Sequence, residues 1–362
     1  MKKIISLLLL AIPTMGWCAI GDTFEIVSKE GVNLTFKITS ETRKEVQFGI
    51  GDSKHVSIDS TYAGSIVIPD DANGYHVTSI ADYAFYNCKY LTSIKCPDDA
   101  VTIGKRAFYN CESAKQIKIS PNTTAIGERA FYGCHGLSMF FIPKNVTVIE
   151  DYTFYNCDNL VYVQIPDGVT KIGSRAFYGC SAFPQIILPD GLLSIGSYAF
   201  MGCEGLEMIV IPDNVTSVGS YAFRNCLDLE SVVVGKNISK SGSYIFRGCQ
   251  SLRTIYSLSE TPSVMGTDFY YSSSSSTKNQ IYDNATLYVP KNSVNAYLSA
   301  DGWNRFKNIV GMDFTGVSHA IVDDADTIVG YYSLKGERLG GPRKGVNIVK
   351  YKNGTTKKIV IK

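Results

Sequence analysis

Cysteine is the residue of this sequence with the widest chemical potential, because thiols form disulfides, bind metals and act as nucleophiles. The 362-residue chain contains ten cysteines. Eight of them follow one another at a fixed interval of 23 residues: Cys88, Cys111, Cys134, Cys157, Cys180, Cys203, Cys226 and Cys249. No Cys-x-x-Cys pair occurs and the histidines are scattered, so we predict neither a metal site nor a metal cofactor.

Residues that could support catalysis do not form a recognisable constellation. The four histidines lie in unrelated contexts: His55, His76, His135 and His319. No nucleophile elbow is present, and no Gly-x-Gly-x-x-Gly follows a strand and opens a helix. Asp70-Asp71 and Asp98-Asp99 share one repeat phase and suit turns better than paired acid–base chemistry, with weak calcium binding as the alternative. We therefore predict a non-enzymatic protein without a cofactor.

The elements that position the cysteines are marked by phenylalanines with the same 23-residue step: Phe85, Phe108, Phe131, Phe154, Phe177, Phe200, Phe223 and Phe246. A fixed period of this length indicates a repeat architecture in which coil stacks on coil. In the shared phrase Ile-Gly-x-x-Ala-Phe-x-x-Cys, Phe and Cys should face a common interior. We therefore interpret the cysteines as buried free thiols that pack as small apolar side chains. A disulfide between neighbouring coils is the alternative, because stacking brings cysteines into bonding range.

Each coil is expected to contain a short strand followed by a tight turn. In one coil Leu160, Val163 and Ile165 point inward, and Pro166 ends the strand because proline cannot donate to a ladder. Stacked coils should form a parallel sheet on the concave wall, with short helical turns on the convex side. We predict a mainly β solenoid with a β cap at the N-terminus and a small β tail at the C-terminus.

Composition excludes a strongly electrostatic partner. The chain is 45% hydrophobic and 19% charged, with a net charge of +2, which is typical of a folded protein and gives no reason to expect nucleic-acid binding. The charge is uneven, because residues 331–362 contain nine basic residues and one acidic residue, a balance of +8 that leaves −6 for the remainder. We expect a basic tail on a slightly acidic body.

The N-terminus is typical of a secretory signal. Lys2 and Lys3 precede an apolar run, Ile4–Ile12, that is too short to span a bilayer as a helix. We expect cleavage near Cys18–Ala19, with acylation of Cys18 as the alternative. No later segment is apolar and long enough to be an integral membrane segment of the mature chain.

The repeat degenerates after the last cysteine of the series. Phe269 keeps the 23-residue step, but no cysteine follows it. A strand at Thr286–Pro290 and a short helix that includes Val294–Tyr297, Trp303, Phe306 and Ile309 should close the core. The expected regions are a signal peptide at 1–19, an N-terminal β cap at 20–64, repeats at 65–257, a degenerate repeat with a C-terminal cap at 258–312, a linker at 313–326 and a β tail at 327–362.

The phrase Ile-Pro-Asp-x-Val-Thr-x-Ile-Gly-x-x-Ala-Phe-x-x-Cys-x-x-Leu resembles the BspA-like leucine-rich repeats of surface and secreted proteins from Gram-negative anaerobes. The resemblance covers residues 65–255, with small departures at Glu150, Thr153 and Ser241. It implies a leucine-rich-repeat solenoid whose role is adhesion, with host extracellular-matrix proteins or other cells as partners.

The tail resembles the C-terminal sorting signals read by the type IX secretion system. The matching residues are Tyr331, Leu334, Gly336 and Leu339, then Gly345–Val349, and finally Lys357–Lys362. This resemblance implies that the protein is secreted or displayed on the surface of a Gram-negative bacterium. A small β tail with solvated lysines is the alternative.

The candidate binding site follows from strand geometry, because residues that alternate with inward ones should tile the concave face. At these positions the third to sixth coils are apolar, which is typical of an interaction surface. We hypothesise that six residues contact a protein partner: Met139, Phe141, Tyr162, Ile187, Met208 and Val210. Strand propensity alone could also have filled these positions. We expect a monomeric adhesin, with a structural or glycan-binding surface protein as the alternative function.

Overall fold

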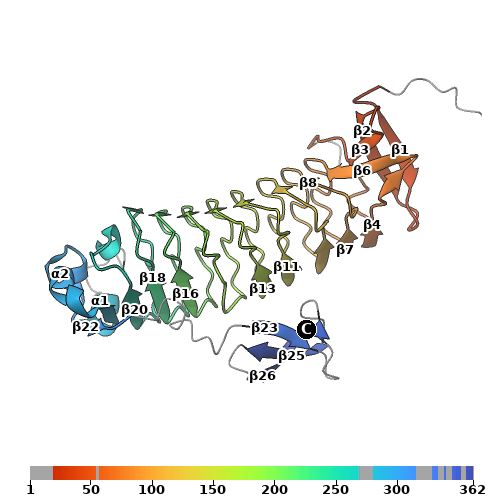
Figure 1. The fold of residues 1–362 in the computed structure, drawn as a ribbon. Coiled ribbons are helices and arrows are strands. Elements are labelled where there is room, and N and C mark those ends of the chain that lie inside the picture. Colours follow the sequence, from red (N-terminus) through yellow and green to blue (C-terminus); the bar gives the residue numbers. More distant parts are fainter. Residues whose placement is uncertain are drawn as a thin grey trace, which may run out of the picture. The chain divides into compact units, whose positions relative to one another are not determined.

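The structure is a computed structural model that describes residues 19–53, 57–267, 269, 280–314, 328–332, 338–339, 345–351 and 356–361. The chain divides into two compact units, the first made of residues 1–137 and 143–146 and the second of residues 138–142 and 147–362. Each unit contains stacked coils of a leucine-rich-repeat solenoid (Figure 1). The predicted fold class is therefore confirmed: the protein is mainly β, with parallel sheets and few helices.

The first unit begins with antiparallel strands. Their bounds are β1 (Thr23–Val27), β2 (Asn33–Ser40) and β3 (Glu45–Phe48), and β2 pairs with both of the others. Leu34, Phe36 and Ile38 alternate with more exposed residues along β2 and are buried. This period of two explains why the segment is a strand with one face in the core.

Parallel pairing starts where β3 meets the next strand, and two sheets run through the first unit. One continues from β3 into β6 (Tyr75–Ile80), β8 (Thr102–Ile103) and β10 (Ala125–Ile126), with β5 (Asp71–Ala72) paired to β6. The other contains β4 (Gly64–Val67), β7 (Leu91–Lys95) and β9 (Gln116–Lys118). Between β5 and β6, Asn73 and Gly74 take positive φ values of 54° and 80°, as a tight hairpin requires.

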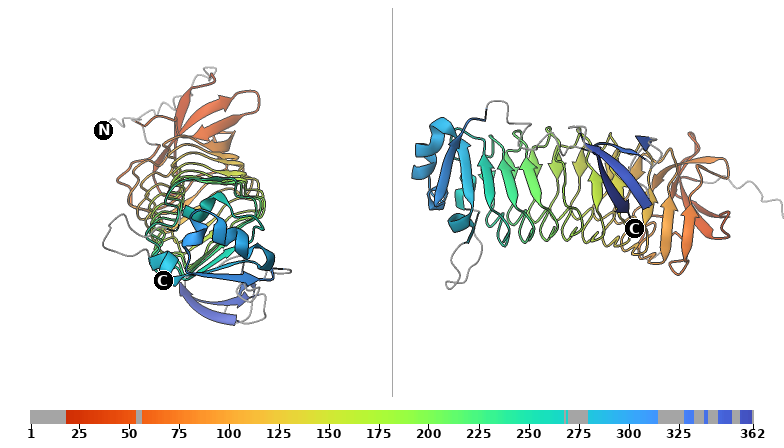
Figure 2. Two further views of the ribbon diagram at one scale, coloured as in Figure 1. Left: turned by 90° about the vertical axis from the view of Figure 1, so that its left-hand side faces the viewer. Right: turned by 90° about the horizontal axis from the view of Figure 1, so that it is seen from below.

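The second unit repeats this pattern of a longer and a shorter strand in each coil. The short strands form one sheet: β12 (Val148–Ile149), β14 (Lys171–Ile172), β15 (Ser194–Ile195), β17 (Ser217–Val218) and β19 (Lys240–Ser241). The longer strands form two: β11 (Met139–Phe141) with β13 (Tyr162–Gln164), and β16 (Met208–Ile211), β18 (Ser231–Val234), β20 (Thr254–Ser257), β21 (Thr286–Pro290) and β22 (Asn308–Met312). All of these pairings are parallel, and the longer strands lie side by side in the right-hand view of Figure 2.

Proline explains why the longer strands of the second unit fall into two sheets. The Val161 amide donates to the Ser138 carbonyl of the preceding coil at 2.9 Å. One coil later the same position is Pro184, which has no N–H to donate. Its carbonyl still accepts from the Glu207 amide at 2.9 Å, so the coil keeps its place in the stack without forming a full strand.

The interior of both units is a ladder of stacked phenylalanines. Phe85, Phe108 and Phe131 stack in the first unit, with neighbouring ring centroids 5.1 and 5.2 Å apart. In the second unit Phe177 and Phe200 are 5.3 Å apart, with an interplanar angle of 5°. Each of these rings is fully buried, so one side chain per coil contributes a large apolar area at the same place.

The cysteines stand beside this ladder. All nine cysteines in the described part of the chain are buried and free, so the predicted column of free thiols is confirmed there. Cys18 lies outside the described residues. The Cys203 thiol donates to the Phe177 carbonyl at 3.2 Å, and Cys111 makes the same bond to Phe85 at 3.3 Å. Burial raises the pKa of these thiols well above the ordinary value, so they stay protonated and pack as small apolar groups.

Short helices close the last coils of the second unit. Their bounds are η1 (Val264–Thr267), α1 (Gln280–Asn284), η2 (Lys291–Ser293), α2 (Val294–Ser299) and η3 (Trp303–Arg305). The Trp303 indole donates to the Ser263 carbonyl at 2.7 Å, which satisfies its N–H inside the core. The prediction of one helix extending to Ile309 is wrong. Ile309 lies on β22, because its backbone completes the ladder with Leu287 of β21.

The described residues between 328 and 361 form a small antiparallel sheet. Its order is β24 (Arg338–Leu339), β23 (Ile328–Tyr332), β25 (Gly345–Tyr351) and β26 (Thr356–Ile361). The predicted signal peptide lies outside the described residues apart from Ala19, and the predicted linker is described only at residues 313 and 314. Over the described ranges no helix combines the length and the apolar character that a bilayer span needs.

Candidate functional site

The candidate surface consists of the outward side chains of the longer strands in the second unit. These strands alternate between buried and more exposed residues, as β16 shows: Ile209 and Ile211 are buried, whereas Met208 and Val210 are half-buried. Parallel pairing in register places equivalent residues of successive coils beside one another. The outward residues therefore form rows that run from coil to coil.

Three of the six predicted residues lie on β11 and β13. Met139 pairs in register with Tyr162, and the Phe141 ring lies 5.7 Å from the Tyr162 ring between centroids. Phe141 is 40% exposed, although it is aromatic and sits on a strand. Burial raises the pKa of the Tyr162 hydroxyl, so this group stays uncharged at neutral pH. The structure therefore brings these three together as an apolar, partly exposed group.

The other three residues lie on the next two coils. Ile187 is 57% exposed and belongs to the coil that Pro184 keeps from forming a full strand. Gln185 makes a parallel bridge with Met208, which carries the Ile187 segment alongside β16. Val210 lies on the same strand as Met208. Among the described residues, β13 and the Gln185 segment are not paired as strands, so the two groups of three are separated by a break in the ladder.

The row of outward residues is longer than the predicted six. Val210 pairs in register with Val233, and Val233 with Tyr256. The Val233 side chain is only 2% exposed between its neighbours, although it occupies an outward position. Tyr256 stacks on Tyr288 at 5.0 Å, and Val310 follows Tyr288 in register.

Tyr288 and Val310 escaped the sequence analysis because the 23-residue step fails there. The residues paired with Thr254 and Thr286 come 32 and 22 residues later in the chain, at Thr286 and Asn308. An alternating pattern at Thr286–Pro290 was visible, but its partner strand could not be located by period alone. Burial first, and then the neighbouring Tyr288, raise the pKa of the Tyr256 hydroxyl, so this end of the row is also uncharged.

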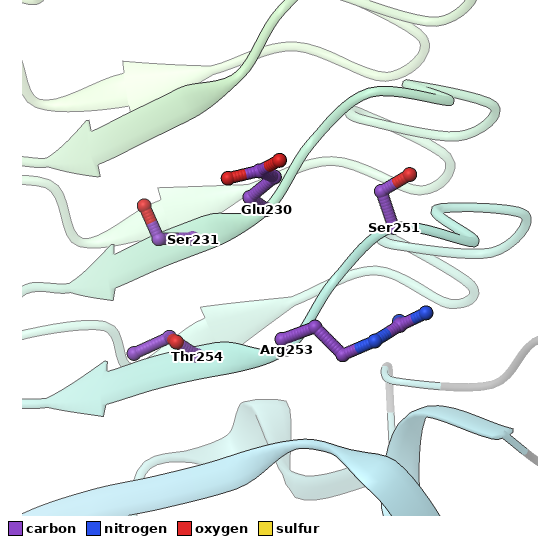
Figure 3. A pocket seen from close by; sticks show the side chains of 5 residues that line it. All are labelled: Glu230, Ser231, Ser251, Arg253 and Thr254. Carbon is purple, nitrogen blue, oxygen red and sulfur yellow. The ribbon is translucent and has the colours of Figure 1, made fainter.

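A polar hollow lies beside the row at the start of β18 and β20. It has a volume of about 400 Å³ and is lined by Glu230, Ser231, Ser251, Arg253 and Thr254 (Figure 3). Arg253 donates to the carbonyls of Gln250 and Leu252, both at 2.9 Å, so its guanidinium is held against the backbone. Ser231 and Thr254 continue the row that contains Met208. The apolar row is therefore bordered by a few fixed polar groups, as binding surfaces commonly are.

The acidic pairs of the first unit have a structural explanation. The Asp98 backbone N–H donates to the Asp70 carboxylate at 2.7 Å, which joins two turns of successive coils. The Asp98 carboxylate also lies 3.4 Å from the Lys95 ammonium. Across the described ranges no group of three or more His, Cys, Asp or Glu side chains is placed to hold a metal ion.

The repeat is matched by a known family model. The model of the BspA type leucine-rich-repeat region matches residues 59–184 and 170–288, in six copies, which is more than half of the chain. The chain belongs to the BspA-type leucine-rich-repeat family. In this BspA-type protein, the stacked phenylalanines and cysteines described above form the interior of the repeats. A comparison with curated proteins gave no significant match.

Solved structures with a similar fold include three bacterial proteins. A leucine-rich-repeat protein from T. pallidum is 23% identical, with 60% of this chain and 87% of that chain covered and a TM-score of 0.44. A leucine-rich cell surface protein from Faecalibacterium prausnitzii A2-165 is 23% identical, with 79% and 94% covered and a TM-score of 0.42. The pneumococcal vaccine antigen PcpA is 17% identical, with 82% and 100% covered and a TM-score of 0.35.

Proposed function

We propose that this BspA-type protein is a non-enzymatic surface adhesin that binds a host extracellular-matrix protein through the outward row of the second unit. The observation that carries the proposal is the exposure of two large apolar side chains, Phe141 and Ile187, at the same outward position of coils two repeats apart. A soluble fold gains nothing by leaving such groups in water, whereas a protein interface buries them. The proposed adhesin acts as a monomer, because the whole row belongs to one chain.

The composition of the row supports a protein partner over a glycan. Met, Phe and Tyr are enriched at the centre of protein interfaces, and the hydroxyls of Tyr162 and Tyr256 are uncharged at neutral pH. The polar hollow at Ser231 and Thr254 lies at the margin of the row, where hydrogen bonds fix the orientation of a partner.

The decisive experiment replaces two apolar residues by charges. Phe141→Asp together with Met208→Asp should reduce binding to an immobilised panel of fibronectin, laminin and collagen by at least about tenfold, which is about 1.4 kcal/mol. The matched control is Ser93→Asp with Gln116→Asp on the polar sheet face of the first unit. Unchanged binding with an intact circular dichroism spectrum would refute the proposal. Capture of glycans on an array by the wild-type protein, with no binding to any matrix protein of the panel, would favour the glycan-binding alternative.

The basic tail belongs to the same proposal. We propose that residues 327–362 are a sorting signal for type IX secretion, which would place the protein outside a Gram-negative cell after its N-terminal signal has been removed. The support is the match at Tyr331, Gly345 and the closing run Lys357–Lys362. Fusing residues 327–362 to a periplasmic reporter in a strain with this system should carry the reporter to the surface. Retention of the reporter in the periplasm would exclude sorting.

A further inference from the structure

The third side of each coil in the second unit, between the short strand and the cysteine, carries a surface that the proposed adhesive row does not use. On this side tyrosine and arginine recur at two positions, two residues before and one residue after the buried phenylalanine. Tyr152, Tyr155 and Tyr178 also occupy these positions in the second unit. We call the other six the tyrosine–arginine face: Arg175, Tyr198, Tyr221, Arg224, Tyr244 and Arg247.

The side chains of this face are stacked on one another along the coils. The Arg175 guanidinium lies 4.3 Å from the centre of the Tyr198 ring. Tyr198 stacks on Tyr221 with ring centroids 4.9 Å apart and an interplanar angle of 15°, and Tyr221 stacks on Tyr244 at 5.5 Å and 23°. The Arg224 guanidinium lies 5.4 Å from the Tyr221 ring centre. The ring faces are therefore occupied by neighbouring coils and by guanidinium groups.

What the face leaves available is a set of hydrogen-bond donors. Within the described part of the chain, the hydroxyls of Tyr198, Tyr221 and Tyr244 make no hydrogen bond. The structure gives Arg175 and Arg224 no ion pair among the residues it describes, and Arg224 Nε is buried without an acceptor. The Arg175 guanidinium donates to the Tyr152 hydroxyl at 2.9 Å. What the face presents is therefore the three phenol hydroxyls of Tyr198, Tyr221 and Tyr244, together with the positive charge of Arg175 and Arg224.

The face is also free of carboxylates. Residues 174–178, 197–201, 220–224 and 243–247 contain three arginines and no Asp or Glu. The same positions in the first unit are neutralised from within, because Glu128 lies 2.8 Å from the Lys105 ammonium and also pairs with Arg129. In the second unit the coil before Arg175 carries Glu150 and Asp151 on this side, and Asp151 accepts from the Ser174 backbone N–H at 2.7 Å. The carboxylate-free part of this side therefore begins at the coil of Arg175 and is not a requirement of the repeat.

We propose that the tyrosine–arginine face binds a linear polysaccharide that carries carboxylate groups. A planar guanidinium matches a carboxylate with two parallel hydrogen bonds, and phenol hydroxyls pair with sugar hydroxyls. Donors repeat once per coil, so the fitting partner repeats its acceptors along a chain. A folded protein partner fits less well, because a tyrosine anchor must insert its ring into a pocket and these rings are held in a stack.

The proposal is tested by measuring the binding of the full chain to polygalacturonate with affinity electrophoresis and biolayer interferometry. The triple variant Arg175→Gln/Arg224→Gln/Arg247→Gln should lose at least about tenfold in affinity, and wild-type binding should weaken as salt screens the charges. The triple variant Tyr198→Phe/Tyr221→Phe/Tyr244→Phe keeps the rings and their stacking and removes only the hydroxyls. It should lose about threefold to tenfold.

Matched controls separate the alternatives. Lys105→Gln with Arg129→Gln in the first unit should leave the affinity unchanged, and fully methyl-esterified polygalacturonate should not bind. Equal or tighter binding to dextran sulfate, or to poly-glutamate, would overturn the assignment to a carboxylated polysaccharide. The assignment would also be overturned if the wild-type protein did not bind polygalacturonate at low salt. The same holds if the Tyr→Phe and Arg→Gln variants bound it with wild-type affinity. The Phe141→Asp/Met208→Asp variant should bind polygalacturonate normally, since it alters a different face.

Discussion

The sheet faces of the two units differ although their interiors are alike. In the first unit Phe108 stacks on Phe131 at 5.2 Å, and in the second Phe177 stacks on Phe200 at 5.3 Å. Outside, β7 and β9 present Ser93, Lys95, Gln116 and Lys118, whereas β11, β13 and β16 present Met139, Phe141, Tyr162, Met208 and Val210. Val67 on β4 is an exposed apolar residue within the polar face.

This difference teaches where the repeat constrains the sequence and where it does not. An inward Phe or Cys has a partner in the coil before and the coil after, so a change there disturbs at least three coils. An outward strand residue contacts only its neighbours in the row and water. Selection for the fold therefore leaves the outward positions free to differ between units, and binding specificity can be built there.

The largest expected effect tests whether the two interiors are equivalent. Buried thiols such as Cys111 and Cys134 in the first unit and Cys180 and Cys203 in the second have raised pKa values because of burial. The unfolded thiol ionises near 9.0. Protonated thiols therefore stabilise the fold fully below pH 9, and this stability is lost as the pH rises above it. Well above pH 9, each buried thiol should lower the free energy of unfolding by about 1.4 kcal/mol per pH unit.

Urea unfolding followed at pH 7, 9 and 10 measures this loss. Tyrosine and lysine titrate in the same range, so the matched variant is Cys203→Ala, which removes one titrating thiol. Its stability should fall less steeply between pH 9 and 10, by about 1 kcal/mol, whatever its stability at pH 7. Cys111→Ala in the first unit should flatten the slope equally. A slope that stays the same in both variants would mean that the thiols do not govern alkaline unfolding.

The second prediction concerns the phenylalanine ladder. Phe108→Ala and Phe177→Ala should each destabilise the protein by about 3–5 kcal/mol, because each leaves a cavity between two stacked rings that the rigid coils cannot fill. Chemical denaturation of the two variants at neutral pH gives the comparison. A much smaller cost in one unit would show that its interior can collapse, and the equivalence of the two interiors would fail.

The repeated interior could be predicted from sequence because its period is unbroken from Phe85 to Phe246. Each inward position carries a similar residue in successive coils, so a structure inferred for one coil applies to the others. The free state of the cysteines followed from the same argument, since a thiol at one repeat phase beside each phenylalanine is buried as a small apolar group, as with Cys203 and Phe177.

Features that depend on a single coil escaped prediction. Pro184 is visible in the sequence, but its effect depends on which amide of that coil donates to the preceding one, and only the structure identifies that amide. Ile309 was assigned to a helix because Trp303 and Phe306 precede it at helical spacing, whereas ladder pairing with Leu287 determines its conformation. The burial of Val233 depends on its neighbours in the row, which no single-strand pattern reveals.

The smallest expected effect on stability comes from exchanging the two surfaces. Met139→Gln with Phe141→Lys gives β11 the residues that Gln116 and Lys118 place on β9. The free energy of unfolding should fall by less than about 1 kcal/mol, since Phe141 is partly exposed and its main loss is the contact with the Tyr162 ring. Thermal and urea unfolding measure the change.

Binding should respond to the same exchange far more strongly than stability does. The exchanged protein should lose at least about tenfold in affinity for the matrix protein that the wild type binds, because a lysine must then be desolvated where an aromatic ring was buried. The reverse exchange, Gln116→Met with Lys118→Phe, should leave both stability and affinity nearly unchanged, because it alters the first unit and leaves the binding row intact. A large loss of stability in the first variant, or binding that survives it, would mean that the outward row of the second unit serves folding and not recognition.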